Sequence, residues 1–127
     1  MPDLPPEFRH IRLELAREPG HPEGSRTTGY DLVAPLDEKQ HLSADMWRKY
    51  KDRCRVHRFR EGEDDMVGRL ARRPGGSWYF DYDADDNTDD ESGYRLGGEH
   101  FVIGEYVSIA DEHGHMHTYR VVSAEPL

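Results

Sequence analysis

Hydrophobic and polar residues alternate along several short segments of the chain, with the period of a half-buried β-strand. In residues 8–16, Ile11, Leu13 and Leu15 are separated by single polar residues. Residues 30–34 and 54–61 are further candidates, followed by two segments that flank Pro74-Gly75-Gly76. Proline and glycine in this order are typical of a tight turn. We therefore predict a strand in each segment, with residues 66–73 and 77–83 paired as a hairpin.

The C-terminal third, residues 101–126, is predicted to be a second hairpin with one apolar face. That face consists of Val107, Ile109, Tyr119 and Val121. Asp111 opens the connection and Gly114 closes it, which is typical of a type I turn followed by a left-handed glycine. Such a turn pairs Ile109 with His117 and keeps the apolar residues together. A two-residue turn at 113–114 would slip the register and mix the two faces, so we reject it.

One helix is predicted to begin at Ser43. Serine is a good N-cap, and Asp45 in the first turn suits the helix dipole. Trp47, Tyr50 and Cys54 follow at spacings of three and four and form an apolar stripe that would pack on a sheet. The glycine- and proline-rich residues 18–28 are predicted to be a loop.

These elements predict an α+β fold that is mostly β, either a bent antiparallel sheet or a small β-barrel with one helix. Residues 1–7 are predicted to be a flexible lead-in, and residues 8–127 a single β-rich domain. The chain has 127 residues, which is enough for one modest core. It has a single cysteine and no long apolar run, and its N-terminus does not resemble a secretion signal, so we expect a cytoplasmic protein and no membrane partner.

The net charge of −9 argues against a general affinity for nucleic acid or anionic membranes. The charge is uneven, however. Residues 43–73 contain ten Lys or Arg and six Asp or Glu, a local charge of +4, so the remainder carries −13. Within this segment the candidate partner-binding residues are Arg48, Lys51, Arg55, Arg58 and Arg60. Aromatic residues between them also suit nucleic-acid binding, but we favour self-pairing or a protein partner.

The histidines of the last hairpin are the candidate metal ligands. His115 and His117 alternate on one strand and can face one ion, with Asp111 nearby. A further ligand could come from His100 or His57. The alternative is a partly buried, hydrogen-bonded His117 that binds no metal. We predict no other cofactor and no catalytic residue.

Two further features allow a functional and a structural interpretation. Residues 81–91 contain seven acids and no base, but their spacing does not fit a calcium-binding EF-hand, so we favour a solvated acidic loop. Cys54 has basic neighbours that would favour a reactive thiolate. A lone cysteine that continues an apolar stripe is more often buried and inert.

At WRKYKDRCRVHRF, GEDDMVGRL, GGSWYFDYD and GEYVSIADEHGHMHTYRVV, the chain resembles a group of small bacterial proteins without an established function. The resemblance covers about residues 28–127 and implies a bacterial source but no mechanism. We therefore expect a non-enzymatic protein-binding or regulatory module, with a homodimer as a further option. The alternative is a metal-dependent or small-molecule-binding protein that uses the hairpin histidines.

Overall fold

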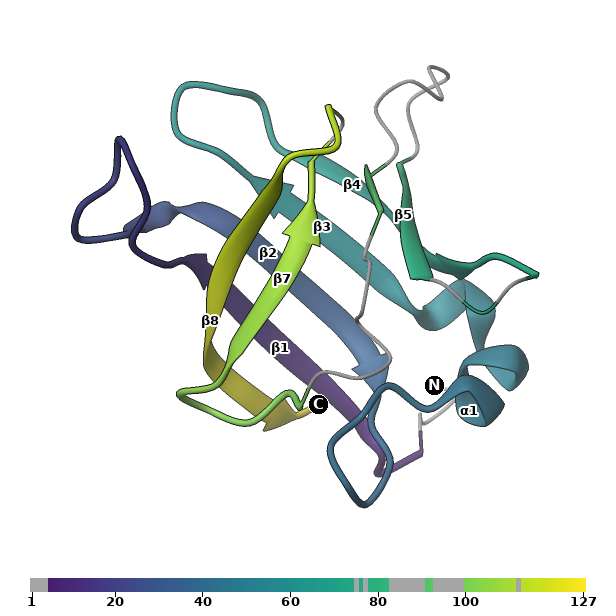
Figure 1. The fold of residues 1–127 in the computed structure, drawn as a ribbon. Coiled ribbons are helices and arrows are strands. Elements are labelled where there is room, and N and C mark those ends of the chain that lie inside the picture. The colour runs from purple at the N-terminus through teal and green to yellow at the C-terminus, as the bar shows by residue number, and fades with distance from the viewer. Residues whose placement is uncertain (1–4, 75, 77, 83–90, 93–99, 112) are drawn as a thin grey trace.

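The computed structural model describes residues 5–74, 76, 78–82, 91–92, 100–111 and 113–127. In this part of the chain all strands belong to one antiparallel sheet, which curls into an open half-barrel (Figure 1). The strands are β1 (Phe8–Leu15), β2 (Ser25–Pro35), β3 (Arg55–Phe59), β4 (Met66–Arg72), β5 (Trp78–Tyr82), β6 (Glu91–Ser92), β7 (Tyr106–Ala110) and β8 (Met116–Pro126). Their order across the sheet is β6-β5-β4-β3-β2-β1-β8-β7.

The predicted class, a mostly β protein with a bent antiparallel sheet and one short helix, is confirmed. The α-helix is α1 (Ala44–Lys49), and a 3-10 helix, η1 (Lys51–Arg53), follows it. Along the chain, both helices lie between β2 and β3. Among the described residues, no helix is both long and apolar enough to span a bilayer.

The core fills the inside of the curled sheet. Tyr30 of β2 contacts Phe80 of β5 and Tyr119 of β8, with 5.1 Å between ring centroids in both pairs. Because neither β5 nor β8 is a neighbour of β2 in the sheet, these rings meet across its interior. Ile11 and Leu13 of β1 are fully buried on the same face. The alternate positions of these strands therefore face outward.

The predicted C-terminal hairpin is confirmed, including its register. Ile109 pairs with His117 and Val107 with Tyr119. The amide of Gly114 donates to the Asp111 carbonyl over 3.0 Å, and Gly114 has a φ of +80°. The strand pair β4–β5 also forms as predicted. Both hairpins are specified by residues close in sequence, and local turn chemistry was sufficient to predict them.

Two predicted boundaries are wrong. β2 begins at Ser25, inside the segment predicted as a loop, because a tight connection at Glu18–His21 and a register shift after Glu14 let it pair with β1 early. The helix ends at Lys49, so Cys54 does not continue a helical stripe, although its side chain is fully buried. The predicted N-cap is confirmed, since the Ser43 hydroxyl accepts from the amide of Met46.

Candidate functional site

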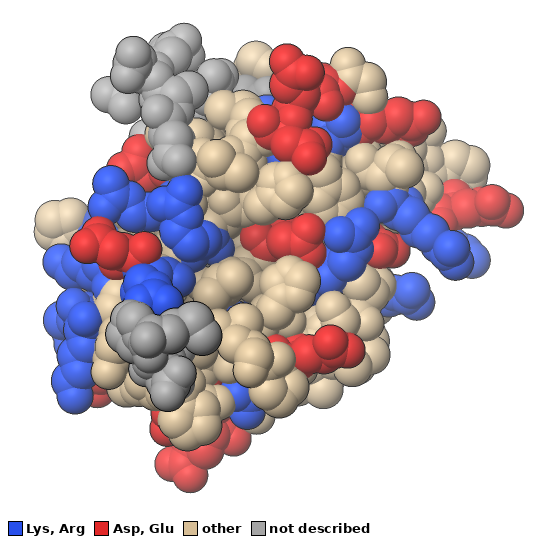
Figure 2. Space-filling view, turned by 180° about the vertical axis from the view of Figure 1, so that it is seen from behind, with Lys and Arg blue, Asp and Glu red and all other residues tan. Residues whose placement is uncertain are grey.

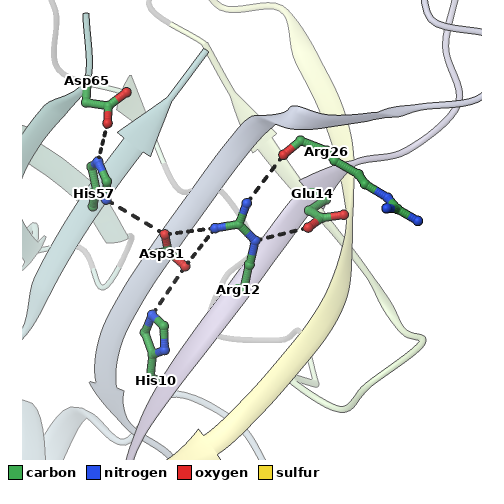
Figure 3. A network of polar contacts seen from close by, with 7 residues as sticks. All are labelled: His10, Arg12, Glu14, Arg26, Asp31, His57 and Asp65. Carbon is green, nitrogen blue, oxygen red and sulfur yellow. Dashed lines mark hydrogen bonds and ion pairs between the residues drawn. The ribbon is translucent and has the colours of Figure 1, made fainter. Parts of the chain in front are cut away.

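The outer face of the sheet carries a polar network centred on Asp31 of β2 (Figure 3). The strand register builds it, because Asp31 lies directly opposite Arg12 on β1 and opposite His57 on β3. His10 is two residues before Arg12 and points to the same face. Three strands that are distant in sequence therefore bring these four side chains together.

Asp31 accepts contacts from three basic side chains. Its carboxylate lies 3.2 Å from Nη1 of Arg12, 3.2 Å from Nε2 of His10 and 3.7 Å from Nδ1 of His57. Its side chain is 17% exposed. Asp65 contacts the other ring nitrogen of His57 at 2.9 Å. The permanently charged partner of Asp31 is Arg12, which Glu14 shares.

Arg12 is fixed by a second set of contacts. Its Nε donates to Glu14 over 3.0 Å, and its guanidinium lies 4.3 Å from the centroid of the Phe59 ring. Phe59 can approach this closely because residue 29 is glycine, where a Cβ would overlap the Leu13 carbonyl oxygen and come within 3.0 Å of the Phe59 ring. Local packing therefore holds the guanidinium on Asp31.

A shallow depression of about 360 Å³ lies beside this network. It is lined by His10, Asp31, Val33, Arg55, Val56, His57 and Val67. Val67 is 49% exposed, and His10 and His57 are exposed to a similar extent. The depression thus combines the Arg55 guanidinium and two imidazoles with exposed apolar surface, which are the features that an anionic group with an aliphatic part would contact.

Cationic side chains gather at the end of the outer face that lies next to α1, on the left edge of the view in Figure 2. Arg55 of β3 is directly opposite Arg69 of β4, and both point outward. Lys51 and Arg53 of η1 are exposed beside them, since η1 contacts β4 through an ion pair of 2.9 Å between Asp52 and Arg69. We call Lys51, Arg53, Arg55 and Arg69 the basic face.

The predicted partner-binding residues do not form one surface. Arg48 is exposed and pairs with Asp45 at 2.7 Å, and Lys51 lies 5.0 Å from the Trp47 ring centroid. Arg55 is half-buried and lines the depression.

Arg58 points the other way and is only 6% exposed. It stacks on Tyr82 and contacts the sulfur of Met66, so its prediction as a partner contact is corrected. Strand alternation is the reason, because Arg58 has the parity of the buried Val56. The Arg60 side chain is also largely covered, at 17% exposure.

The predicted metal residues are only partly brought together. Asp111 and His117 are in contact, with 2.9 Å between Oδ2 and Nε2. The Nδ1 atom of His117 contacts Glu18 at 2.9 Å. Both ring nitrogens are thus engaged by carboxylates, while His115 is 77% exposed and lies 3.9 Å from Asp111. Among the described residues, no group of three or more His, Cys, Asp or Glu could hold a metal ion.

The Glu18–His117–Asp111 contact is an electrostatic clamp that favours the imidazolium form. Partial burial lowers the pKa of His117, but the hydrogen bonds to Glu18 and Asp111 outweigh it and leave that pKa above its ordinary value. Partial burial raises the pKa of Asp111. Hydrogen bonds from His117 and from two backbone amides outweigh this effect and lower that pKa to about 2. This geometry matches the alternative of a hydrogen-bonded histidine that joins two connections.

Two further candidates, Cys54 and His100, are engaged in contacts within the part of the chain that the structure describes. Burial raises the pKa of Cys54 to about 12, so its thiol is unreactive at neutral pH. His100 stacks on His41, with 4.5 Å between ring centroids. Of the acidic segment 81–91, residues 83–90 lie outside the described residues.

The chain was also compared with known proteins. No family model matches it, and neither a curated protein nor a solved structure matches it. The resemblance to bacterial proteins, the cytoplasmic location and the homodimer therefore stay predictions. The candidate site is accordingly argued from geometry alone.

Proposed function

We propose that this protein is a non-enzymatic binding module, and that its basic face binds an acidic segment of a partner protein. The observation that carries the proposal is the pair of arginines at directly opposed positions, Arg55 and Arg69. Like charges in such positions destabilise a sheet. A carboxylate of an acidic partner that lies between the two guanidinium groups would attract both and offset their repulsion.

The charge around the pair supports the same partner. The basic face has four cations, and two carboxylates border it at Arg69: Asp52 of η1 and Asp81, which is directly opposite Arg69 on β5. Arg69 and Asp52 are both more than half exposed, so their ion pair contributes little stability and can exchange for a partner's carboxylate. Exposed charges are screened within about 8 Å at physiological ionic strength. A short acidic segment therefore interacts more strongly with the nearby cations of the basic face than with the distant charges that make up the net charge of −9.

Nucleic acid is the less favoured partner. A duplex presents phosphates over a long stretch and would therefore meet the rest of a protein whose net charge is −9. The exposed Val67 in the neighbouring depression also offers an apolar contact that a phosphate backbone does not use. A peptide that alternates acidic and aliphatic side chains complements both features.

The test is the affinity of a fluorescein-labelled octapeptide of alternating glutamate and valine, measured by fluorescence anisotropy. Removing both charges with Arg55→Gln plus Arg69→Gln is expected to weaken binding about tenfold, equivalent to about 1.4 kcal/mol. Arg17→Gln is the matched control, because Arg17 is exposed in the β1–β2 connection. It should leave the affinity unchanged.

Three outcomes would overturn the proposal. One is the absence of saturable binding of the octapeptide, and another is equal affinity for the wild-type and doubly substituted proteins. Stronger binding of a twelve-nucleotide single- or double-stranded DNA than of the peptide would assign a nucleic-acid role instead.

A further inference from the structure

We propose that the depression beside Arg55 is a carboxylate subsite, where one acidic side chain of the partner lies over Val33 between His10 and Arg55. This inference rests on the proposed function and names the contact that the partner would make there. Nothing in the sequence pattern pointed to it, because the three residues come from three different strands.

The register of the sheet places the three residues in a row on the outer face. His10 is opposite Val33 on one side, and Arg55 is opposite Val33 on the other. Adjacent strands lie about 4.8 Å apart, so the backbones that carry His10 and Arg55 are about 10 Å apart. A carboxylate above Val33 is therefore within reach of a donor from either side.

The donors remain available to a ligand. Among the described residues, His10 makes its only polar contact through Nε2 with Asp31, which leaves Nδ1 open, and its side chain is 47% exposed. Arg55 also interacts within the protein, but a guanidinium has five N–H donors and can serve a ligand as well. A protonated His10 and Arg55 can thus donate to the same carboxylate.

Asp31 is the carboxylate nearest the subsite, and its permanently charged partner is Arg12, which it shares with Glu14. The Asp31 side chain is less exposed than those of His10, His57 and Arg12. The ligand therefore meets histidine and arginine donors at the rim, where they are more accessible than the Asp31 carboxylate.

The apolar part of the depression favours an acidic side chain over inorganic phosphate. Val33 packs against the core, and Val67 is 49% exposed at the opposite side of the lining. The methylene groups of a glutamate can cover these valines and remove apolar surface from water. Phosphate has no aliphatic part and would gain nothing from this contact.

Protonation of the histidines should strengthen the subsite. His10 faces Asp31, Arg12 and, across from β8, Glu125; His57 faces Asp31, Asp65 and the Phe59 ring. Arg12 and Arg55 keep their charges throughout. An imidazolium form of either histidine adds attraction for the carboxylate of a glutamate ligand.

The experiment is an NMR titration of the ¹⁵N-labelled protein with N-acetyl-glutamate N-methylamide at pH 6. The uncharged glutamine analogue and inorganic phosphate are the comparison ligands. We expect millimolar binding of the glutamate compound, with shift changes centred on His10, Val33 and Arg55. His10→Gln and Arg55→Gln should abolish these changes, whereas His113→Gln, at an exposed position of the β7–β8 turn, should not.

The possible results separate the subsite from the proposed function. Equal shifts with the glutamine analogue, tighter binding of phosphate, or unchanged binding in His10→Gln would overturn the subsite. If the acidic octapeptide still binds in those cases, the basic face keeps its partner and only the subsite falls. If neither the glutamate compound nor the octapeptide binds, both proposals fail.

Discussion

The thiol of Cys54 lies fully buried where η1 meets β3, and it donates to the Tyr50 carbonyl over 3.4 Å. Burial raises its pKa to about 12. At pH 8 only about one thiol in 10,000 is then ionised, and the thiolate is the reactive form. Burial thus outweighs the basic residues that are next to Cys54 in sequence.

We expect native Cys54 to react with 5,5′-dithiobis(2-nitrobenzoate) at pH 8 at least 100-fold more slowly than the urea-unfolded protein. The absorbance of the released thiolate measures both rates. Release of one equivalent within seconds from the native protein would contradict the burial of this residue and restore the nucleophile hypothesis.

Gly29 is the residue on which the packing of Phe59 and Arg12 depends. A Cβ at this position would overlap the Leu13 carbonyl oxygen and crowd the Phe59 ring. Gly29→Ala is therefore expected to lower the free energy of unfolding by about 3 kcal/mol, a value typical of severe overpacking. Urea denaturation measures the loss.

Gly20→Ala is the comparison for this substitution. Gly20 has open space around it and a φ of +91°, so alanine costs only the left-handed backbone, about 1–2 kcal/mol. A loss for Gly29→Ala no larger than that for Gly20→Ala would show that β1 and β2 are not packed as closely as described.

At the scale of elements, the Glu18–His117–Asp111 clamp joins the β1–β2 connection to the β7–β8 hairpin. The pKa of His117 is raised, so its contribution is complete below about pH 6.5 and is lost as the pH rises through the raised value. The pKa of Asp111 is lowered to about 2. Its contribution is therefore complete above about pH 4 and is lost as the pH falls towards 2.

We expect His117→Gln to destabilise the protein most between about pH 4 and 6.5, by about 1 kcal/mol for such a partly exposed contact. Urea denaturation at pH 2, 5.5 and 9 measures the difference from wild type. His113→Gln, at an exposed position of the same hairpin, is the control. A difference that does not change with pH, or that is greatest at pH 9, would contradict the clamp.

A buried hydrogen bond joins α1 to the sheet: Nε1 of Trp47 donates to the Leu70 carbonyl of β4 over 2.8 Å. Trp47→Phe keeps an aromatic ring but leaves this carbonyl without its donor. The expected loss of unfolding free energy is about 2 kcal/mol. Lys51→Ala, which removes only an exposed contact with the Trp47 ring, should cost less than about 0.5 kcal/mol. A Trp47→Phe protein as stable as wild type would contradict this docking.

The sequence predicted elements well where the relevant residues are neighbours along the chain. Asp111 and Gly114 were sufficient to predict the turn of the last hairpin, and Ser43 was sufficient to predict the start of α1. The early start of β2 at Ser25 was missed, because it depends on pairing with β1 rather than on the composition of residues 25–28. The helix was predicted too long, since an apolar stripe does not show where a helix gives way to a 3-10 turn.

At the scale of the whole molecule, the curled sheet decides which charges meet. His10, Asp31 and His57 are far apart in sequence, and only the pairing of β1, β2 and β3 makes them neighbours. Alternation within each segment already indicated which residues share a face. The sequence does not indicate the order of the strands across the sheet. Without that order, neither the polar network nor the arginine pair could be predicted.

The same sheet distributes the basic residues of segment 43–73 over its two faces. Arg58 points to the core side of the sheet. Residues 61–65, four of which are acidic, follow β3 at the end away from α1. Arg55 and Arg69 remain together on the outer face with η1 beside them. The account therefore depends on whether this particular end of the outer face is where a partner binds.

The most direct measurement is chemical-shift mapping of the ¹⁵N-labelled protein with the glutamate–valine octapeptide at pH 7. The account predicts that the largest amide shifts fall on η1 and on the outward-facing residues of β3 and β4 around Arg55 and Arg69. It also predicts that these shifts weaken as salt is added, since exposed charges are screened. Shifts centred instead on β7, β8 or the His117 clamp, or no shifts at saturating peptide, would contradict it.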